Sequence, residues 1–342
     1  MGLRQLSFFA VLLLAPRAWA TTWDEPWQDE VLRKADTLVK AEVLANDGKS
    51  INLKVVETLA GAQVSEKATV EGFSLLRLTS FSPGADETKF AFKKGQFYYF
   101  LLTKQKDGKT WAVATPTAGY ARVEDGTVYA TYRHSFHQAL VPRELYETTM
   151  KAIFLKTHGK EVDADALRKT LLPILKQAPQ GAPKDAEEKD QAKRFFEQHA
   201  ALETLAYFAL ADDLKIIEPF LKCDSYHVQI SAVRAVGGIN SREARERLLA
   251  FLEGDGNGFA KVMAVWALKR QNARDCLPKL KELQRKAPGD RVGFGGNLMD
   301  PRVGTHFPGS VKSAIEDLVA EWSRPEAPAT PKAETPDRPT GR

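Results

Sequence analysis

The chain is poor in cysteine, nearly balanced in charge and without a long hydrophobic run. Only Cys223 and Cys276 are cysteines among its 342 residues, too few for the disulfide framework of a small secreted domain. The 49 basic and 44 acidic residues are mixed along the chain, which lacks the concentrated positive charge of a nucleic-acid-binding protein. The clearest apolar run, residues 6–15, is about half as long as a membrane-spanning helix. We therefore expect no nucleic-acid partner and no transmembrane segment in the mature chain.

Signatures of catalysis are also missing. No nucleophile elbow, paired-carboxylate signature or nucleotide-binding loop stands out in the sequence. The segment Gly293-Phe294-Gly295-Gly296 comes nearest to an anion-binding loop, but no Lys-Ser/Thr pair follows it. The sequence therefore predicts no catalytic residue and no cofactor.

The chain begins with the features of a secretory leader. Arg4 precedes the apolar run, and Ala18-Trp19-Ala20 forms a small-x-small cleavage site. Cleavage after Ala20 would remove Arg4 and Arg17 and lower the net charge from +5 to +3. We expect residues 1–20 to be a signal peptide and the mature protein to be exported, to the periplasm or the extracellular medium.

Short segments of alternating polarity follow, separated by turns. Val39, Ala41 and Val43 alternate with polar residues up to the turn Asn46-Asp47-Gly48, a pattern typical of a hairpin with one buried face. The expected strands lie at 39–43, 51–55, 68–71, 96–103, 110–115, 120–123 and 127–132. This pattern predicts an antiparallel β-barrel or sandwich over residues 21–140.

The first two strands, in "ADTLVKAEVLANDGKSINLKVVETLAG" at residues 35–61, resemble the opening of OB-type barrels of the netrin-like group. The resemblance implies a small closed barrel. Protease inhibition, known in that group, requires a cysteine at the mature N-terminus, and here Thr21 stands at that position. That activity is therefore not expected.

Helical sequence begins where the barrel ends. Pro142 suits a helix start and Gly159 a helix end, while Asp163 or Asp165 can cap a second helix that runs to Leu175. These features predict connecting helices over residues 141–176. The Pro-, Gly- and charge-rich residues 177–190 are interpreted as a linker.

The remaining chain repeats a helical hairpin. Residues 230–252 and 262–283 align at a spacing of 32 residues, which sets Ala232 on Ala264 and Ala235 on Ala267. An earlier copy covers residues 201–222, and a final helix is expected over 311–322. The Ala-rich first and Leu-rich second helices resemble HEAT-type repeats, a resemblance that implies a protein-binding α-solenoid.

The predicted fold class is therefore α+β in two parts, an antiparallel OB-like β-barrel followed by an all-α HEAT-like solenoid at residues 191–323. Residues 324–342 are rich in proline, have no large apolar side chain and are predicted to be disordered. Cys223 and Cys276 fall in different helix pairs, roughly 20 Å apart at about 10 Å per layer, too far for a disulfide. Both are expected to be buried free thiols.

His134 and His137 are the weak metal candidates, two imidazoles three residues apart that would need His158 or Glu144 as a third ligand. The alternative is that both are simply polar residues at the exit of the barrel. Residues 288–309 interrupt the repeat as a Gly- and Pro-rich insertion that is either a binding loop or only a bridge between the last two repeats.

Candidate binding residues lie on the predicted second helices and in the insertion. Arg242 aligns with Arg274 and Arg247 with Lys279, giving two columns of positive charge that either line a groove for an acidic partner or form a solvated face. Trp266, aligned with Arg234, is expected to be a packing residue. The candidates in the insertion are Arg291, Phe294, Arg302, His306 and Phe307.

These observations favour an exported, non-enzymatic binding protein that recognises a protein or peptide through its solenoid. One alternative is a metal-dependent hydrolase with a site near His134 and His137. Another is a structural component of the cell envelope.

Overall fold

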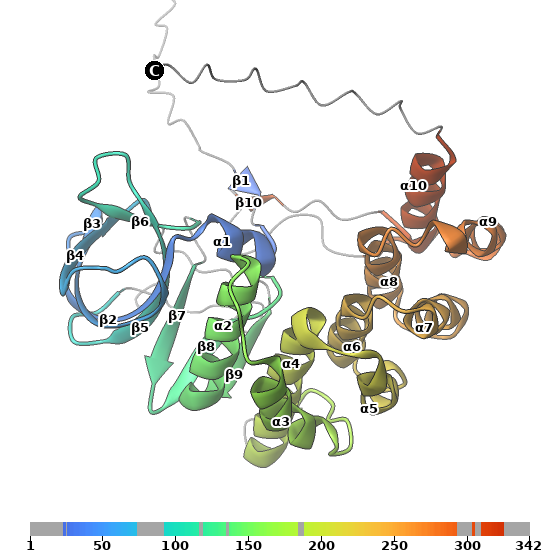
Figure 1. The fold of residues 1–342 in the computed structure, drawn as a ribbon, viewed down its shortest axis with the longest axis horizontal. Coiled ribbons are helices and arrows are strands. Elements are labelled where there is room, and N and C mark those ends of the chain that lie inside the picture. Colours follow the sequence, from blue (N-terminus) through green and yellow to red (C-terminus); the bar gives the residue numbers. More distant parts are fainter. Residues whose placement is uncertain are drawn as a thin grey trace, which may run out of the picture.

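The computed structural model describes residues 23–24, 26–73, 92–115, 119–134, 137–183, 188–292, 303–304 and 309–324. A β-barrel, a central layer of strands and helices, and a stack of helix pairs follow one another along this part of the chain (Figure 1). The predicted signal peptide and nearly all of the predicted tail lie outside the described residues. In the described ranges, no helix is long and apolar enough to cross a membrane.

The barrel is closed by five strands. They are β2 (Thr37–Asn46), β3 (Ser50–Gly61), β4 (Lys67–Glu71), β5 (Phe97–Lys104) and β6 (Trp111–Val113). Their order is β2-β3-β4-β6-β5, and β5 returns to pair with β2, where Thr37 lies opposite Leu102. The barrel confirms the predicted fold class and fits the OB-type resemblance. One detail of the prediction was wrong, because β4 and β6 run parallel and the barrel is not wholly antiparallel.

Alternating polarity and tight turns explain why these residues form a barrel. Val39, Ala41 and Val43 of β2 are fully buried inside it. The Oδ1 atom of Asp47 accepts hydrogen bonds from the backbone N–H groups of Lys49 and Ser50, which fixes the turn between β2 and β3. Asp107 fixes the turn between β5 and β6 in the same way.

The sheet continues beyond the barrel. Strands β7 (Tyr120–Glu124), β8 (Thr127–Thr131) and β9 (Gln138–Pro142) extend it from β5 in sequence order. The sequence predicted β7 and β8 but not β9, whose residues follow the two histidines that were interpreted as the exit of the barrel. Of the described residues between β8 and β9, Tyr132 contacts α2 (Arg143–Thr157), Arg133 contacts α6 (Tyr226–Gly238) and His137 contacts α4 (Lys189–Phe208).

Three helices form the central layer, namely α1 (Gln28–Lys34), α2 (Arg143–Thr157) and α3 (Ala164–Leu175). The predicted boundaries of the last two are confirmed. Gly159 follows α2 with a φ of 65°, a left-handed conformation that glycine adopts without strain. Asp163 caps α3 by accepting a hydrogen bond of 2.9 Å from the N–H of Ala166. Helix α1 had no counterpart among the predicted elements.

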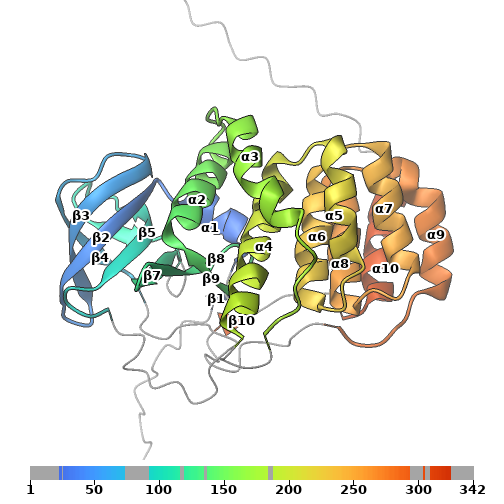
Figure 2. The same ribbon diagram turned by 90° about the horizontal axis from the view of Figure 1, so that it is seen from below.

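The helical stack contains α4 (Lys189–Phe208), α5 (Leu214–Leu221), α6 (Tyr226–Gly238), α7 (Arg242–Glu253), α8 (Gly258–Arg270), α9 (Leu277–Lys286) and α10 (Val311–Ser323). Figure 1 shows two rows: α4, α6, α8 and α10 on the side nearer the barrel, and α5, α7 and α9 on the far side. We call these the inner row and the outer row. Figure 2 shows the pairs following one another away from the barrel, as expected for a solenoid.

Two glycines allow the inner row to pack closely. A Cβ atom added to Gly237 would lie 2.6 Å from the Cβ atom of Ala267 in α8. One added to Gly238 would lie 2.4 Å from the carbonyl oxygen of Ala206 in α4. The end of α6 therefore touches both neighbours without intervening side chains, which is why small residues recur in the aligned first helices.

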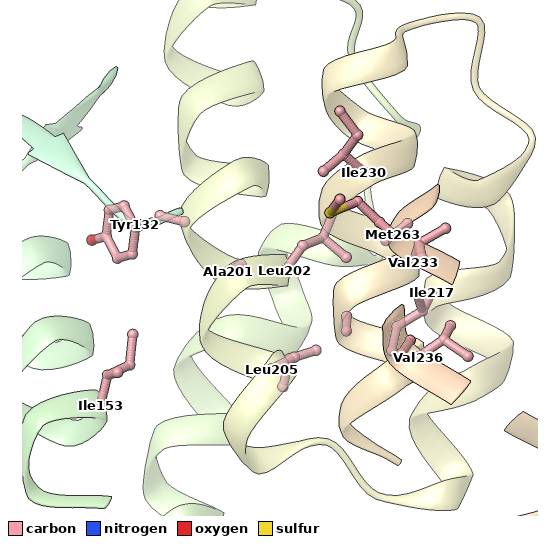
Figure 3. Close-up of a cluster of buried hydrophobic side chains, with 14 of the residues drawn as sticks. Tyr132, Ile153, Ala201, Leu202, Leu205, Ile217, Ile230, Val233, Val236 and Met263 are labelled. Atoms are coloured by element: carbon pink, nitrogen blue, oxygen red, sulfur yellow. The ribbon is translucent and has the colours of Figure 1, made fainter. Parts of the chain in front are cut away.

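The core is continuous between the central layer and the stack. The barrel interior forms one buried cluster, whereas a second cluster runs from α1, β8, β9 and α2 through α4 to α10. Figure 3 shows α4 between the two sides of this cluster, with Tyr132 and Ile153 on one side and Val233 of α6 on the other. Apolar packing therefore connects the extended sheet directly to the solenoid.

Two smaller observations complete the fold. Strand β1 (Trp23–Asp24) pairs in parallel with β10 (Val303–Gly304), which lies within the Gly-rich insertion. Cys223 and Cys276 are both free, as predicted. The prediction that both are buried was wrong for Cys223, which is half-buried because it follows the end of α5.

Candidate functional site at the junction of barrel and stack

The cations predicted on the second helices lie on the outer row or just before it, and each has a partner. Arg242 pairs with Glu246 at 2.8 Å, and Arg247 pairs with Glu218 at 3.6 Å. Lys279 forms ion pairs with acidic side chains of α7 and α9, and Arg274 donates a hydrogen bond to the carbonyl oxygen of Trp322. The columns of positive charge are therefore partly neutralised.

The cations that line a groove between α9 and α10 are less neutralised by acidic side chains than those of the outer row. The groove has a volume of about 450 Å³ and is lined by Lys281, Gln284, Arg285, Lys312 and Glu316. Within the described part of the chain, none of these three cations forms an ion pair. With three cations and one carboxylate in its lining, the groove carries an excess of positive charge that would attract an anionic side chain from another molecule.

The insertion is described only in part. Arg291 is exposed, and its backbone forms an isolated antiparallel bridge with Ser310 at the start of α10. The other predicted contact residues, Phe294, Arg302, His306 and Phe307, lie outside the described residues. The predicted role of the insertion in binding stays a prediction.

The two candidate metal ligands are buried and lie in different surroundings. His134 packs edge-on against Trp27, with ring centroids 5.4 Å apart. His137 packs instead against His199 of α4 at 4.2 Å and His227 of α6 at 4.6 Å. The sequence therefore identified a histidine that belongs to a cluster, but it did not identify the other two members.

The proposed third ligands are engaged elsewhere. His158 stacks on Phe154 with ring centroids 4.3 Å apart, and its Nε2 atom lies 3.0 Å from the carbonyl oxygen of Leu32. Glu144 is exposed on the first turn of α2. Among the described residues, no group of three or more His, Cys, Asp or Glu side chains could hold a metal ion.

A buried polar network surrounds the histidine cluster. Glu203 of α4 accepts a hydrogen bond of 2.7 Å from Nε of Arg234 and one of 2.8 Å from the hydroxyl of Ser231. His199 Nδ1 lies 2.9 Å from the same hydroxyl, and Arg133 approaches Glu203 at 3.6 Å. We call these side chains the junction network; its members are Arg133, His137, His199, Glu203, His227, Ser231 and Arg234.

Trp27 closes the network on the side of α8. Its ring lies 5.8 Å from that of Trp266, and the guanidinium of Arg234 lies 5.3 Å from its centroid. Trp266 therefore packs against the N-terminal segment, which agrees with its predicted role as a packing residue. Residues from before and after the barrel meet the inner row at the same place.

Burial controls the charge of the network. It lowers the pKa of His137 and of His199 well below the usual value, and nearby Arg133 adds to the effect for both. It also lowers the pKa of His227 to about 3, again with help from Arg133. Burial lowers the pKa of Arg133 to about 10, although Glu203 opposes that shift. At neutral pH the three histidines are therefore uncharged, and the buried charges are two guanidinium groups and one carboxylate.

Sequence reasoning missed most of this network, yet one signal was visible. His227, Ser231 and Arg234 follow one another at positions i, i+4 and i+7 of a helix whose other central residues, apart from Gln229, are apolar and buried. His199 and Glu203 have the same i, i+4 spacing in α4. A polar stripe on an otherwise buried helix indicates a polar partner, but the partner itself comes from a distant part of the chain.

The comparisons with known proteins address the helical half. Residues 228–254 match the PBS lyase HEAT-like repeat. This match spans most of α6 and all of α7, so the helix pair at the centre of the stack is a HEAT-like repeat. Searches among curated proteins and among solved structures found no match.

Proposed function

We propose that the chain is an exported scaffold that recognises a protein or peptide without catalysing a reaction. The observation that carries this proposal is the HEAT-like repeat at residues 228–254, flanked by further helix pairs in the same stack. Such arrays suggest protein–protein interaction, since their extended surfaces present many side chains to a partner. The leader-like residues 1–20 support export.

The outer row and the groove at its end are the proposed partner surface. Arg242 and Arg274 stand exposed on successive pairs of the stack, and the cations of the α9–α10 groove continue the positive charge. An acidic segment would be attracted to this surface and would compete with Glu246 for Arg242. The inner row near α4 and α6 is already covered by the chain itself.

The test is affinity capture from an envelope extract with the mature chain as bait, followed by rebinding of the purified partner. The double variant Arg242→Glu, Arg274→Glu should fold normally, as judged by circular dichroism and melting temperature, and should lose the partner. The matched control Lys54→Glu, Lys67→Glu makes the same change of charge on a cross-strand pair of the barrel and should retain it. Equal capture by both variants would refute the outer row as the interface.

The same sample distinguishes the alternatives. Elemental analysis that finds about one zinc per chain, together with no captured protein, would favour a hydrolase. Stable oligomers in light scattering without any soluble ligand would favour a structural role in the envelope. One stoichiometric partner whose rebinding depends on the outer row would support the scaffold.

A further inference from the structure

Beside the apolar packing that joins the barrel side to the inner row lies a buried polar contact. Trp27 and the segment that follows β8 lie against α4, α6 and α8, and Arg133 donates hydrogen bonds of 3.3 Å to the carbonyl oxygen of His227 and 3.4 Å to Ser231. Only about 4% of Arg133 is exposed. Polar contacts between two parts of one chain are generally easier to separate than apolar contacts.

The histidines are the least satisfied members of the junction network. Among the described residues, neither ring nitrogen of His137 has a hydrogen-bond partner, and Nε2 of His199 has none either. Both side chains are almost completely buried, and their rings are in contact. A buried polar atom without a partner weakens the closed arrangement, because the same atom would be hydrated if the contact opened.

Added protons would meet mainly positive charge. Every element packed here contributes a charged or titratable group. They are Asp29 of α1, Arg133 and His134 after β8, Glu203 of α4, Tyr226 and Arg234 of α6, and Arg270 of α8. Glu203 is the one carboxylate among them that is fully buried, and it is already shared by Arg133 and Arg234. A protonated imidazole would therefore lack a counter-charge.

We propose that the histidine cluster is an acid-sensitive lock, and that proton uptake by His137, His199 and His227 releases Trp27, Arg133 and His137 from the inner faces of α4 and α6. This inference goes beyond the proposed function and does not depend on which surface binds a partner. Opening would expose the polar stripe of α6 and the facing side of α4, a second surface that the closed chain covers.

The direction of the pH effect follows from the difference in pKa between the two states. In the open state the imidazoles are solvated and have pKa values near 6.5, whereas in the closed state these values are lowered. Above about pH 6.5 both states hold neutral imidazoles, so pH has no effect. Below about pH 6.5 the open state binds more protons than the closed state. Each histidine then raises the equilibrium constant for opening by up to about tenfold per pH unit.

Amide hydrogen exchange of the purified chain at pH 7.5 and 5.5, corrected for the intrinsic rate at each pH, tests the lock. Protection of α1 and of the inner faces of α4 and α6 should fall at least tenfold at the lower pH. Residues 51–55 of β3 and 68–70 of β4, whose buried side chains belong to the separate barrel cluster, should keep their protection and serve as the internal reference. Equal loss in strands and helices would mean general acid unfolding and would overturn the proposal.

Single-histidine variants test whether the pH-dependent loss of amide protection comes from the histidine cluster. His137→Phe keeps a ring against His199 but cannot take up a proton. The loss of amide protection in α4 and α6 between pH 7.5 and pH 5.5 should therefore be about tenfold smaller in this variant than in the wild type. His227→Gln, at a less buried position, provides a second case if His137→Phe does not fold. His158→Phe, outside the cluster, should behave as the wild type. An unchanged pH effect in both cluster variants, or protection of these helices by added zinc at pH 7.5, would overturn the lock.

Discussion

His137 and His199 lie ring against ring, 4.2 Å between centroids, although one follows strand β8 and the other belongs to helix α4. Neutral imidazoles can pack in this way, whereas two charged ones would repel each other in so buried a place. The contact joins the extended sheet to the solenoid. Beside this contact, Glu203 of α4 accepts hydrogen bonds from Ser231 and Arg234 of α6.

Replacing Glu203 with Gln should destabilise the fold by about 3 kcal/mol or more, because two buried guanidinium groups would lose their shared counter-charge. Urea unfolding at pH 7.5 measures the loss. The matched control is Glu246→Gln, which breaks the exposed pair with Arg242 and should change the stability far less, because solvent screens that pair. Equal losses in the two variants would contradict the importance of the buried pair.

Trp27→Ala should loosen the N-terminal segment from the stack, since it removes ring contacts with His134 and Trp266 and the cation–π contact with Arg234. We expect a loss of about 2–3 kcal/mol and faster proteolysis between α1 and β2. Trp27→Phe, which retains a ring, should lose about half as much. The idea fails if Trp27→Ala leaves the rate of cleavage unchanged.

Gly238→Ala should destabilise the stack even though alanine favours helices more than glycine does. The added methyl group would lie 2.4 Å from the carbonyl oxygen of Ala206, a backbone atom that cannot move without shifting α4. Overpacking of this kind costs about 1–3 kcal/mol. Gly181→Ala, where no atom lies within 4 Å of the new Cβ, should be close to neutral in the same thermal melt.

The two thiols should both react in denaturant without prior reduction, because neither forms a disulfide. In the native protein Cys223 should react first. Cys276 is buried, and burial raises the pKa of its thiol, so less reactive thiolate is present at pH 7.5. A colorimetric thiol assay should resolve two phases whose rates differ by at least about tenfold, and Cys223→Ser should remove the fast one.

The local sequence pattern was sufficient to predict much of the fold. The alternation around Val39 and Ala41 predicted β2, and Gly159 and Asp163 predicted where α2 ends and α3 begins. The spacing that set Ala235 on Ala267 predicted the stacked helix pairs, and the family match covers the first of those two copies. In each case neighbouring residues carry the signal.

The rest depends on residues that are far apart in sequence. Closure of the barrel requires Thr37 to meet Leu102, and the parallel pair of β4 and β6 has no turn of its own to indicate it. The histidine cluster unites His137, His199 and His227 from three elements. The sequence gives no register between such segments, and so His137 was considered with His134, its neighbour in sequence, instead of with its neighbours in space.

The pairing of β1 with β10 has a consequence for the order in which the protein folds. Residues 23–24 are synthesised before the barrel, but their partners at residues 303–304 follow only after the barrel and most of the described helices. Contacts between such distant segments form late, because the chain between them must first be ordered. The N-terminal strand must therefore remain unpaired through most of translation, and during that interval a chaperone or a second nascent chain could occupy its exposed backbone.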